Sequence, residues 1–295
     1  MQHGTVDGFS YGLVTPVAAY LMACLGGALG LRCTTRSLRN GGTFKPGWLT
    51  LGATSIGSGI WTMHFIAMMG FTVAGAPISY DRPLTFASLG VAVGMVGIGI
   101  FIVGYRGATP LALITGGTIT GLGIATMHYL GMAGMRFQGR VEYDTFTVVL
   151  SVVIAVVAAT SALWAAVSVH GFLASLGASL VMGLAVSGMH YTAMAAVDVH
   201  LDPAAGAAPV GDSAPGVLLP MLIGPVVFLL LAGVVVMFDP LLVMGDPAPR
   251  DRTAPRPGLP AQRGPRAYGE PANWSARRPA AGASGRSPRR GRQRG

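Results

Sequence analysis

Long apolar runs, almost free of charge, alternate with short polar connections along most of the chain. Seven of these runs hold about 20 residues or more, enough for a helix to cross a hydrocarbon core of roughly 30 Å. The predicted spans are residues 9–31, 48–70, 84–104, 109–135, 145–169, 171–197 and 216–238. The pattern predicts an all-α polytopic membrane protein with seven transmembrane helices.

Composition supports this prediction. Only 11% of the 295 residues are charged, and the mean hydropathy is +0.57, which is typical of membrane proteins rather than soluble ones. The start of the chain has no basic segment followed by a cleavage site, so we expect the first apolar run to remain as a helix. The predicted location is the cytoplasmic membrane of the cell, in which the protein is multi-pass.

The net charge of +9 is unevenly distributed. Basic residues gather in the first loop and in the segment after Phe238, which holds 12 arginines. The positive-inside rule places both clusters in the cytoplasm, so the N-terminus is predicted outside and the C-terminus inside. Membrane lipid is the expected partner of the arginines, and nucleic acid is not expected. The first-loop cluster is Arg32, Arg36, Arg39 and Lys45, and the opposite, outer face carries Asp7, Asp81, Glu142, Asp144, Asp198, Asp202 and Asp212.

One sequence pattern recurs three times, in the second, fourth and sixth predicted helices. It reads Gly-x-(Gly/Ala)-(Ile/Val)-x-x-Met-His-(Phe/Tyr)-x-x-Met and is centred on His64, His128 and His190. The spacing equals a pair of spanning helices with their loops, so we expect three repeated helical hairpins plus one helix. The predicted membrane domain is residues 1–240. Residues 241–295, rich in Arg, Pro and Gly, are predicted to form a disordered cytoplasmic tail.

The repeated pattern carries metal-ligand chemistry. A histidine and the methionine four residues later share one helix face, and imidazole with thioether suits copper, above all Cu(I). Mg²⁺ and Ca²⁺ prefer oxygen ligands, and zinc gains nothing from methionine. A glycine seven residues before each histidine is expected to let the three helices converge. The predicted copper ligands are His64, His128, His190, Met63, Met68, Met127, Met132, Met189 and Met194.

Structural roles were weighed for the same residues. A methionine fills gaps in many cores, and a histidine in a membrane helix can bind a neighbouring helix by a hydrogen bond. Three copies at one depth favour a shared site, because buried polar groups are costly in a membrane. The pairs Tyr80-Asp81 and Tyr143-Asp144 are interpreted as helix caps or as an outer rim that gathers metal. His200 is the best accessory ligand outside the pattern.

With these residues in hand, the chain resembles the MHYT domain family of bacterial integral-membrane sensors over about residues 9–240. Tyr129 and Tyr191 match the Met-His-Tyr word that names the family, and Phe65 does not. The resemblance implies a copper site near the outer face that senses a diatomic gas. Family members often carry a cytoplasmic signalling domain. We expect none after Phe238, so the signal would pass to a separate cytoplasmic protein.

Three functions were compared. The first is a copper-dependent membrane sensor of O₂, CO, NO or redox state, without enzymatic activity. The second is a copper-handling or transport protein, which would need ligands staged through the whole bilayer. The third is a haem protein with two histidines as axial ligands. A retinal protein is disfavoured, because a Schiff base needs a lysine at membrane depth and the sole lysine is Lys45, in a loop.

Overall fold

The computed structural model describes residues 2–3, 5–8, 10–38, 46–74, 76–169, 171–201 and 214–238. These residues lie in the first of two compact units, residues 1–247. The predicted tail and four residues named above, Arg39, Lys45, Asp202 and Asp212, lie outside the described residues. The seven described helices are α1 (Val14–Leu38), α2 (Pro46–Met69), α3 (Arg82–Arg106), α4 (Pro110–Ala133), α5 (Thr145–Ser168), α6 (Phe172–Met194) and α7 (Ala214–Met237).

Local signals set several helix ends. Asp81 and Asp144 are the N-caps of α3 and α5, where each side chain accepts a backbone hydrogen bond, so the predicted capping role is confirmed. Thr109 caps α4 in the same way. The predicted start of the first helix at residue 9 is wrong, because a turn that contains Gly12 at φ 60° precedes Val14. That helix also runs on past Arg32 to Leu38.

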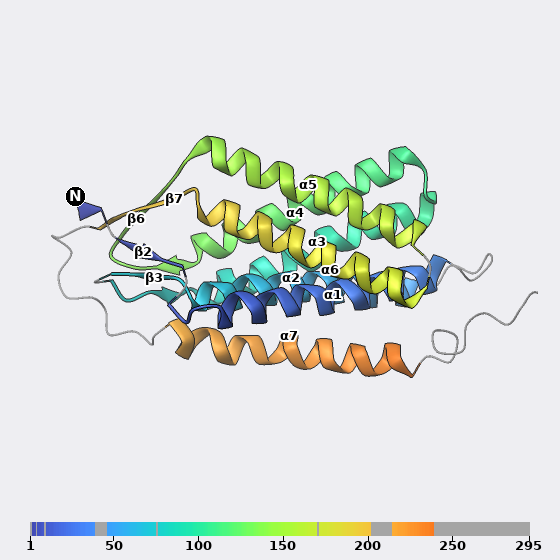
Figure 1. Cartoon of the computed structure of the whole chain (residues 1–295), viewed down its shortest axis with the longest axis horizontal. Coiled ribbons are helices and arrows are strands. Elements are labelled where there is room, and N and C mark those ends of the chain that lie inside the picture. Colours follow the sequence, from blue (N-terminus) through green and yellow to red (C-terminus); the bar gives the residue numbers. More distant parts are fainter. Residues whose placement is uncertain are drawn as a thin grey trace, which may run out of the picture. The chain divides into compact units, whose positions relative to one another are not determined.

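Six helices form a closed ring. Each of α1 to α6 packs against its neighbours in the chain, and α6 closes the ring on α1. Helix α7 packs outside the ring against α2 and α1, and Figure 1 shows it running along the edge of the bundle. The histidine-bearing helices α2, α4 and α6 therefore alternate with α1, α3 and α5 around a common axis.

The protein is a mostly helical, multi-pass protein of the cytoplasmic membrane. Among the described residues, six helices are long and apolar enough to cross a membrane: α1, α3, α4, α5, α6 and α7. Helix α2 is not among them, and its polar side chains include those of Ser55, Ser58 and Thr62. These three side chains are buried within the protein, so α2 exposes little surface that would have to be apolar.

Within the described part of the chain, seven short strands that were not predicted from the sequence cover one end of the helices. They form a three-stranded sheet in the order β1-β7-β6 and two pairs, β2-β3 and β4-β5. Figure 1 shows β2, β3, β6 and β7 gathered there, and this end is called the strand end below. The strands are β1 (Gln2–His3), β2 (Val6–Asp7), β3 (Thr72–Val73), β4 (Ser79–Tyr80), β5 (Met135–Arg136), β6 (Gly139–Tyr143) and β7 (Val197–Leu201).

Candidate metal centre

The three pattern histidines lie in one layer near the strand end. His64, His128 and His190 each sit about one turn before the last residue of α2, α4 and α6. All three helices end at the strand end, because strands follow each of them in the chain. The imidazoles are 1%, 0% and 2% exposed. Equal depth in three alternate helices of a closed ring brings the three rings to the axis.

The three Nδ1 atoms form a nearly equilateral triangle. Nδ1 of His64 lies 3.1 Å from Nδ1 of His190 and 3.2 Å from Nδ1 of His128, and the third side is 3.3 Å. The centre of such a triangle lies one side divided by √3, or about 1.9 Å, from each corner, close to the roughly 2.0 Å of metal–imidazole bonds. The predicted convergence is confirmed, and the triad could hold a metal ion.

The donor set is made of nitrogen. The described residues contain one group of three or more His, Cys, Asp or Glu side chains with metal-binding spacing, and its members are these histidines. The rings cross steeply, with interplanar angles of 73°, 76° and 78°, so each lone pair can point to the centre without ring overlap. Cys24 and Cys33 are buried on α1 and are not members of this group. A neutral nitrogen set disfavours Mg²⁺ and Ca²⁺.

The predicted methionine ligands surround this layer. Met63, Met68, Met127, Met132 and Met189 are buried in the core cluster, and Met194 is partly buried against it. This placement agrees with a role in packing and with a role as ligands. The thioethers therefore stay predicted ligands, whereas the imidazoles are brought together by the fold.

An aromatic ring supports each histidine. The rings of His64 and Phe65 have centroids 4.5 Å apart, those of His128 and Tyr129 4.9 Å, and those of His190 and Tyr191 5.0 Å, all edge-on. Phe65 fills the place that tyrosine takes in the other two copies. The shared feature at this position is therefore the ring and not the phenol.

A second ring follows in two copies, at the strand end. Tyr80 packs against Phe65 with a centroid separation of 6.0 Å, and Tyr143 packs against Tyr129 at 5.7 Å. Burial raises the pKa of the Tyr80 and Tyr143 phenols above the ordinary value. The pairs Tyr80-Asp81 and Tyr143-Asp144 thus combine a ring that supports the motif aromatic with an aspartate that caps the next helix.

Hydrogen bonds and an ion pair of two aspartates stabilise the segments that connect the helices at the strand end. Asp81 accepts a hydrogen bond from the Leu84 backbone and from Arg136 at 3.1 Å, and these contacts hold the pKa of the Asp81 carboxyl below its usual value. Hydrogen bonds from the hydroxyl and backbone of Thr147 lower the pKa of Asp144.

His200, the predicted accessory ligand, lies in β7, where Nε2 is 3.2 Å from a carboxylate oxygen of Glu142. It is not part of the histidine group, so this interpretation is not supported. The backbone of His3 is described in β1, opposite His200.

The glycines of the repeated pattern act differently from the prediction. A Cβ atom at Gly57 would meet the backbone of Val93 in α3, and one at Gly121 would meet that of Val156 in α5. At Gly183 it would meet Cys24 in α1. The glycines therefore allow α3, α5 and α1 to pack closely against α2, α4 and α6. The axis between α2, α4 and α6 is lined instead by residues four and eight positions before each histidine.

One residue of the site was missed. A Cβ atom at Gly131 in α4 would lie 2.6 Å from Nε2 of His64, so only glycine leaves room for this imidazole. The signal was in the sequence, because the same position of the pattern holds Ala67 and Ala193 in the other copies.

Comparisons with known proteins agree with the repeats. A family model, MHYT, described as the bacterial signalling protein N-terminal repeat, matches residues 57–116 and 121–179. Each match begins at the glycine seven residues before a pattern histidine; the third copy lies beyond the two matches. A comparison with solved structures found no match.

Three curated relatives are signalling proteins. The chain is 38% identical over 204 residues to the bifunctional diguanylate cyclase/cyclic di-GMP phosphodiesterase MucR of Pseudomonas aeruginosa, which covers 68% of this chain and 30% of MucR. It is 36% identical to the cyclic di-GMP phosphodiesterase NbdA of the same species, over 65% of the chain and 26% of NbdA. It is 32% identical to the signaling protein YkoW of Bacillus subtilis, over 62% and 24%. The chain thus spans less than a third of the length of these relatives, and it belongs to the MHYT family of membrane sensor domains.

Proposed function

We propose that the chain is a membrane sensor in which His64, His128 and His190 bind one copper ion through Nδ1. The observation that carries the proposal is the triangle of three Nδ1 atoms with sides of 3.1, 3.2 and 3.3 Å. Unprotonated Nδ1 atoms that face one another repel through their lone pairs, and a cation at the centre removes this cost. The neighbouring methionines complete a soft environment that favours copper over harder ions.

The ion would supply an open coordination position for a diatomic gas, O₂, CO or NO, or a change of oxidation state. The chain's own residues hold the imidazoles, exclude water and transmit a shift of α2, α4 and α6 along the helices. Two relatives are named for cyclic di-GMP turnover, so the proposed output is a cytoplasmic signalling protein of that kind. The chain itself is proposed to be a sensor without catalysis.

The geometry favours this function over the two alternatives. Ile60, Ile124 and Val186 lie one turn below the histidines and line the axis, so this turn offers no ligand for a transported ion. The next row along the axis contributes a single thioether, that of Met182. Nδ1 atoms within 3.3 Å of one another leave no room for a porphyrin plane between two histidines.

We further propose that all seven helices span the membrane, with the strand end outside. Arg36 and Arg106 lie in the last turns of α1 and α3, at the end opposite to the strands. Asp81, Glu142 and Asp144 lie at the strand end. The positive-inside rule assigns the arginine end to the cytoplasm.

Copper content tests the site. Protein purified in lipid nanodiscs should carry about one copper ion per chain, and His64→Ala, His128→Ala and His190→Ala should each lose most of it. His200→Ala is the matched control, a histidine of the same chain outside the triad, and should keep its copper. Unchanged copper in any of the triad variants would contradict a single shared site. Carbon monoxide added to the reduced protein should give an infrared CO band that His128→Ala lacks.

A further inference from the structure

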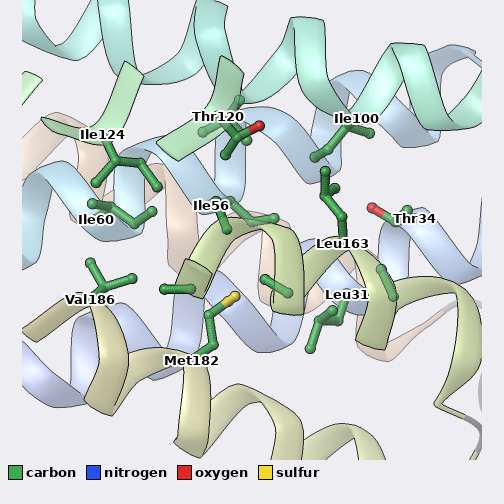
Figure 2. Close-up of a pocket in the computed structure, with 15 residues that line it drawn as sticks. Leu31, Thr34, Ile56, Ile60, Ile100, Thr120, Ile124, Leu163, Met182 and Val186 are labelled. Atoms are coloured by element: carbon green, nitrogen blue, oxygen red, sulfur yellow. The ribbon is translucent and has the colours of Figure 1, made fainter. Parts of the chain in front are cut away.

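An apolar cavity lies on the axis of the ring, on the side of the histidines away from the strands. Two rows of residues from the repeated pattern line it, four and eight positions before each histidine. The first row is Ile60, Ile124 and Val186, and the second is Ile56, Thr120 and Met182. Figure 2 shows the first row grouped at one end and the second row further along the cavity. The first row is thus one helical turn from the imidazoles.

The size and lining of the cavity restrict its occupant. Its volume is ≈30 Å³, about two spheres the size of a water molecule. The lining is apolar except for the hydroxyl groups of Thr34 and Thr120, and it consists of aliphatic side chains together with Met182. Water needs two to four polar partners in such a place, and dry apolar cavities take up xenon or apolar molecules instead. A diatomic gas fits this space, whereas a retinal or quinone ring exceeds it.

The cavity has a thin wall toward the membrane. A groove of ≈650 Å³ runs between α5 and α6, and the exposed side chains of Val157, Trp164 and Val181 place it on the lipid-facing surface. Three residues line both the groove and the cavity: Ala158, Ala162 and Met182. The two spaces are therefore separated by one layer of side chains.

Met182 is the movable part of this wall. Its methyl group packs against Gly27 of α1, at the place a Cβ atom would need. Methionine is unbranched with three rotatable bonds, and the two alanines beside it leave space for its movement. Rotation of this side chain would join the groove to the cavity.

We propose that the cavity binds one small apolar molecule the size of a diatomic gas, admitted from the bilayer between α5 and α6 past Met182. Such gases concentrate in hydrocarbon relative to water, so the membrane is the richer source. What the gas does at the metal rests on the proposed function. Binding in the cavity does not, because the lining contains no metal ligand of the triad.

Xenon tests the cavity without metal. In metal-free His64→Ala protein in nanodiscs, with labelled methyl groups, rising xenon pressure should shift the resonances of Ile60, Ile124 and Val186 and saturate. Leu229, equally buried but packed elsewhere, should not shift. Unchanged cavity resonances would overturn the inference. If the shifts saturate but the wild-type protein binds no copper, the gas cavity is supported and the proposed copper site is refuted.

A matched pair of variants tests the location. Ala162→Leu fills the shared wall and should abolish the saturating shift, whereas Ala165→Leu, on the same helix and lining the groove alone, should keep it. Ala166→Leu, which lines the cavity alone, is the second filling variant if Ala162→Leu does not fold. Equal effects of the three substitutions would contradict the assignment.

The route is tested by exchange. Met182→Ala thins the wall, so xenon exchange, measured from methyl line shapes, should become several-fold faster than in Ala165→Leu. An unchanged or slower exchange rate would place the entrance elsewhere.

Discussion

Nε2 of His64 lies directly against Gly131 of the neighbouring helix, where a Cβ atom would be 2.6 Å away; the same Cβ atom would lie 3.1 Å from Cζ of Phe65. Two of the positions at which the pattern varies, a phenylalanine in place of tyrosine and a glycine in place of alanine, thus lie against each other. The rings of His64 and Phe65 therefore occupy the space that an alanine methyl group at position 131 would need.

Gly131→Ala should displace the imidazole of His64. The added methyl overpacks a buried contact, which costs about 1–3 kcal/mol, and we expect a lower unfolding temperature and loss of most of the copper. Thermal unfolding and metal analysis measure both effects. Gly94→Ala, where a Cβ atom meets nothing within 4 Å, should leave both unchanged or raise stability slightly. Normal copper content in Gly131→Ala would disprove the steric role of this glycine.

Phe65→Tyr should destabilise the protein although it restores the family word. Phe65 is 0% exposed, so a hydroxyl there adds volume and an unpaired polar group, at a cost of about 1–3 kcal/mol. The counterpart is Tyr129→Phe, which removes a 2.8 Å hydrogen bond to Ser151 and should cost about 1 kcal/mol. Denaturation of the two variants should rank them in this order; a neutral Phe65→Tyr would contradict the packing argument.

Asp81→Asn should change the dependence of stability on acid. The Leu84 backbone and Arg136 lower the pKa of Asp81 in the folded protein, so the carboxylate stabilises the fold above its unfolded pKa of about 3.9. This contribution is lost as the pH falls through the folded pKa. Unfolding temperatures measured from pH 7 to pH 3 should therefore differ between wild type and variant near neutrality and converge in acid.

Asparagine remains a good N-cap, so this comparison isolates the charge of Asp81. Arg136→Gln removes the second cause of the lowered pKa and should show a smaller change in the same direction. A difference that persists unchanged at pH 3 would assign the effect to something other than the carboxylate.

Cysteine labelling should reveal the orientation. With Cys24 and Cys33 replaced by alanine, Glu142→Cys at the strand end should react with an impermeant maleimide in intact cells. Arg106→Cys lies at the end of α3 that is opposite to the strands, and it should react only after the membrane is broken. The reverse pattern would invert the proposed topology. Equal labelling of both cysteines in intact cells would contradict a spanning α3.

The helices and the meeting of the histidines were predictable from sequence. Apolar length fixed the positions of the helices to within a few residues, except at both ends of α1, which begins at Val14 and runs to Leu38. The repeat fixed the depth of His64, His128 and His190, since the same pattern in three hairpins of similar length must place them in one layer. Asp81 and Asp144 were recognisable as caps from their positions before apolar runs.

Side-chain fit and strand pairing were not predictable. The strands join segments far apart in the chain, as β4 and β5 do. Five of them have two residues, too few for a periodic signal, and only β6 and β7, of five residues each, alternate apolar and polar side chains. Gly57 was correctly identified as a close-packing position, but its partner was wrong. Seven residues make almost two full helical turns, so the glycine and the histidine face nearly the same direction. Which neighbouring helix the glycine meets depends on the order of the helices around the ring, and the sequence does not give this order.

Each corner of the nitrogen triangle comes from a different hairpin, and His64 and His190 are 126 residues apart in the chain. An ion held there would act as a cross-link that closes two long loops, which constrains the unfolded chain far more than a local contact does. Assembly of the centre requires that the last hairpin has docked, and loss of the ion would loosen all three hairpins together. In the proposed site, metal occupancy and closure of the helical ring would in this way be coupled.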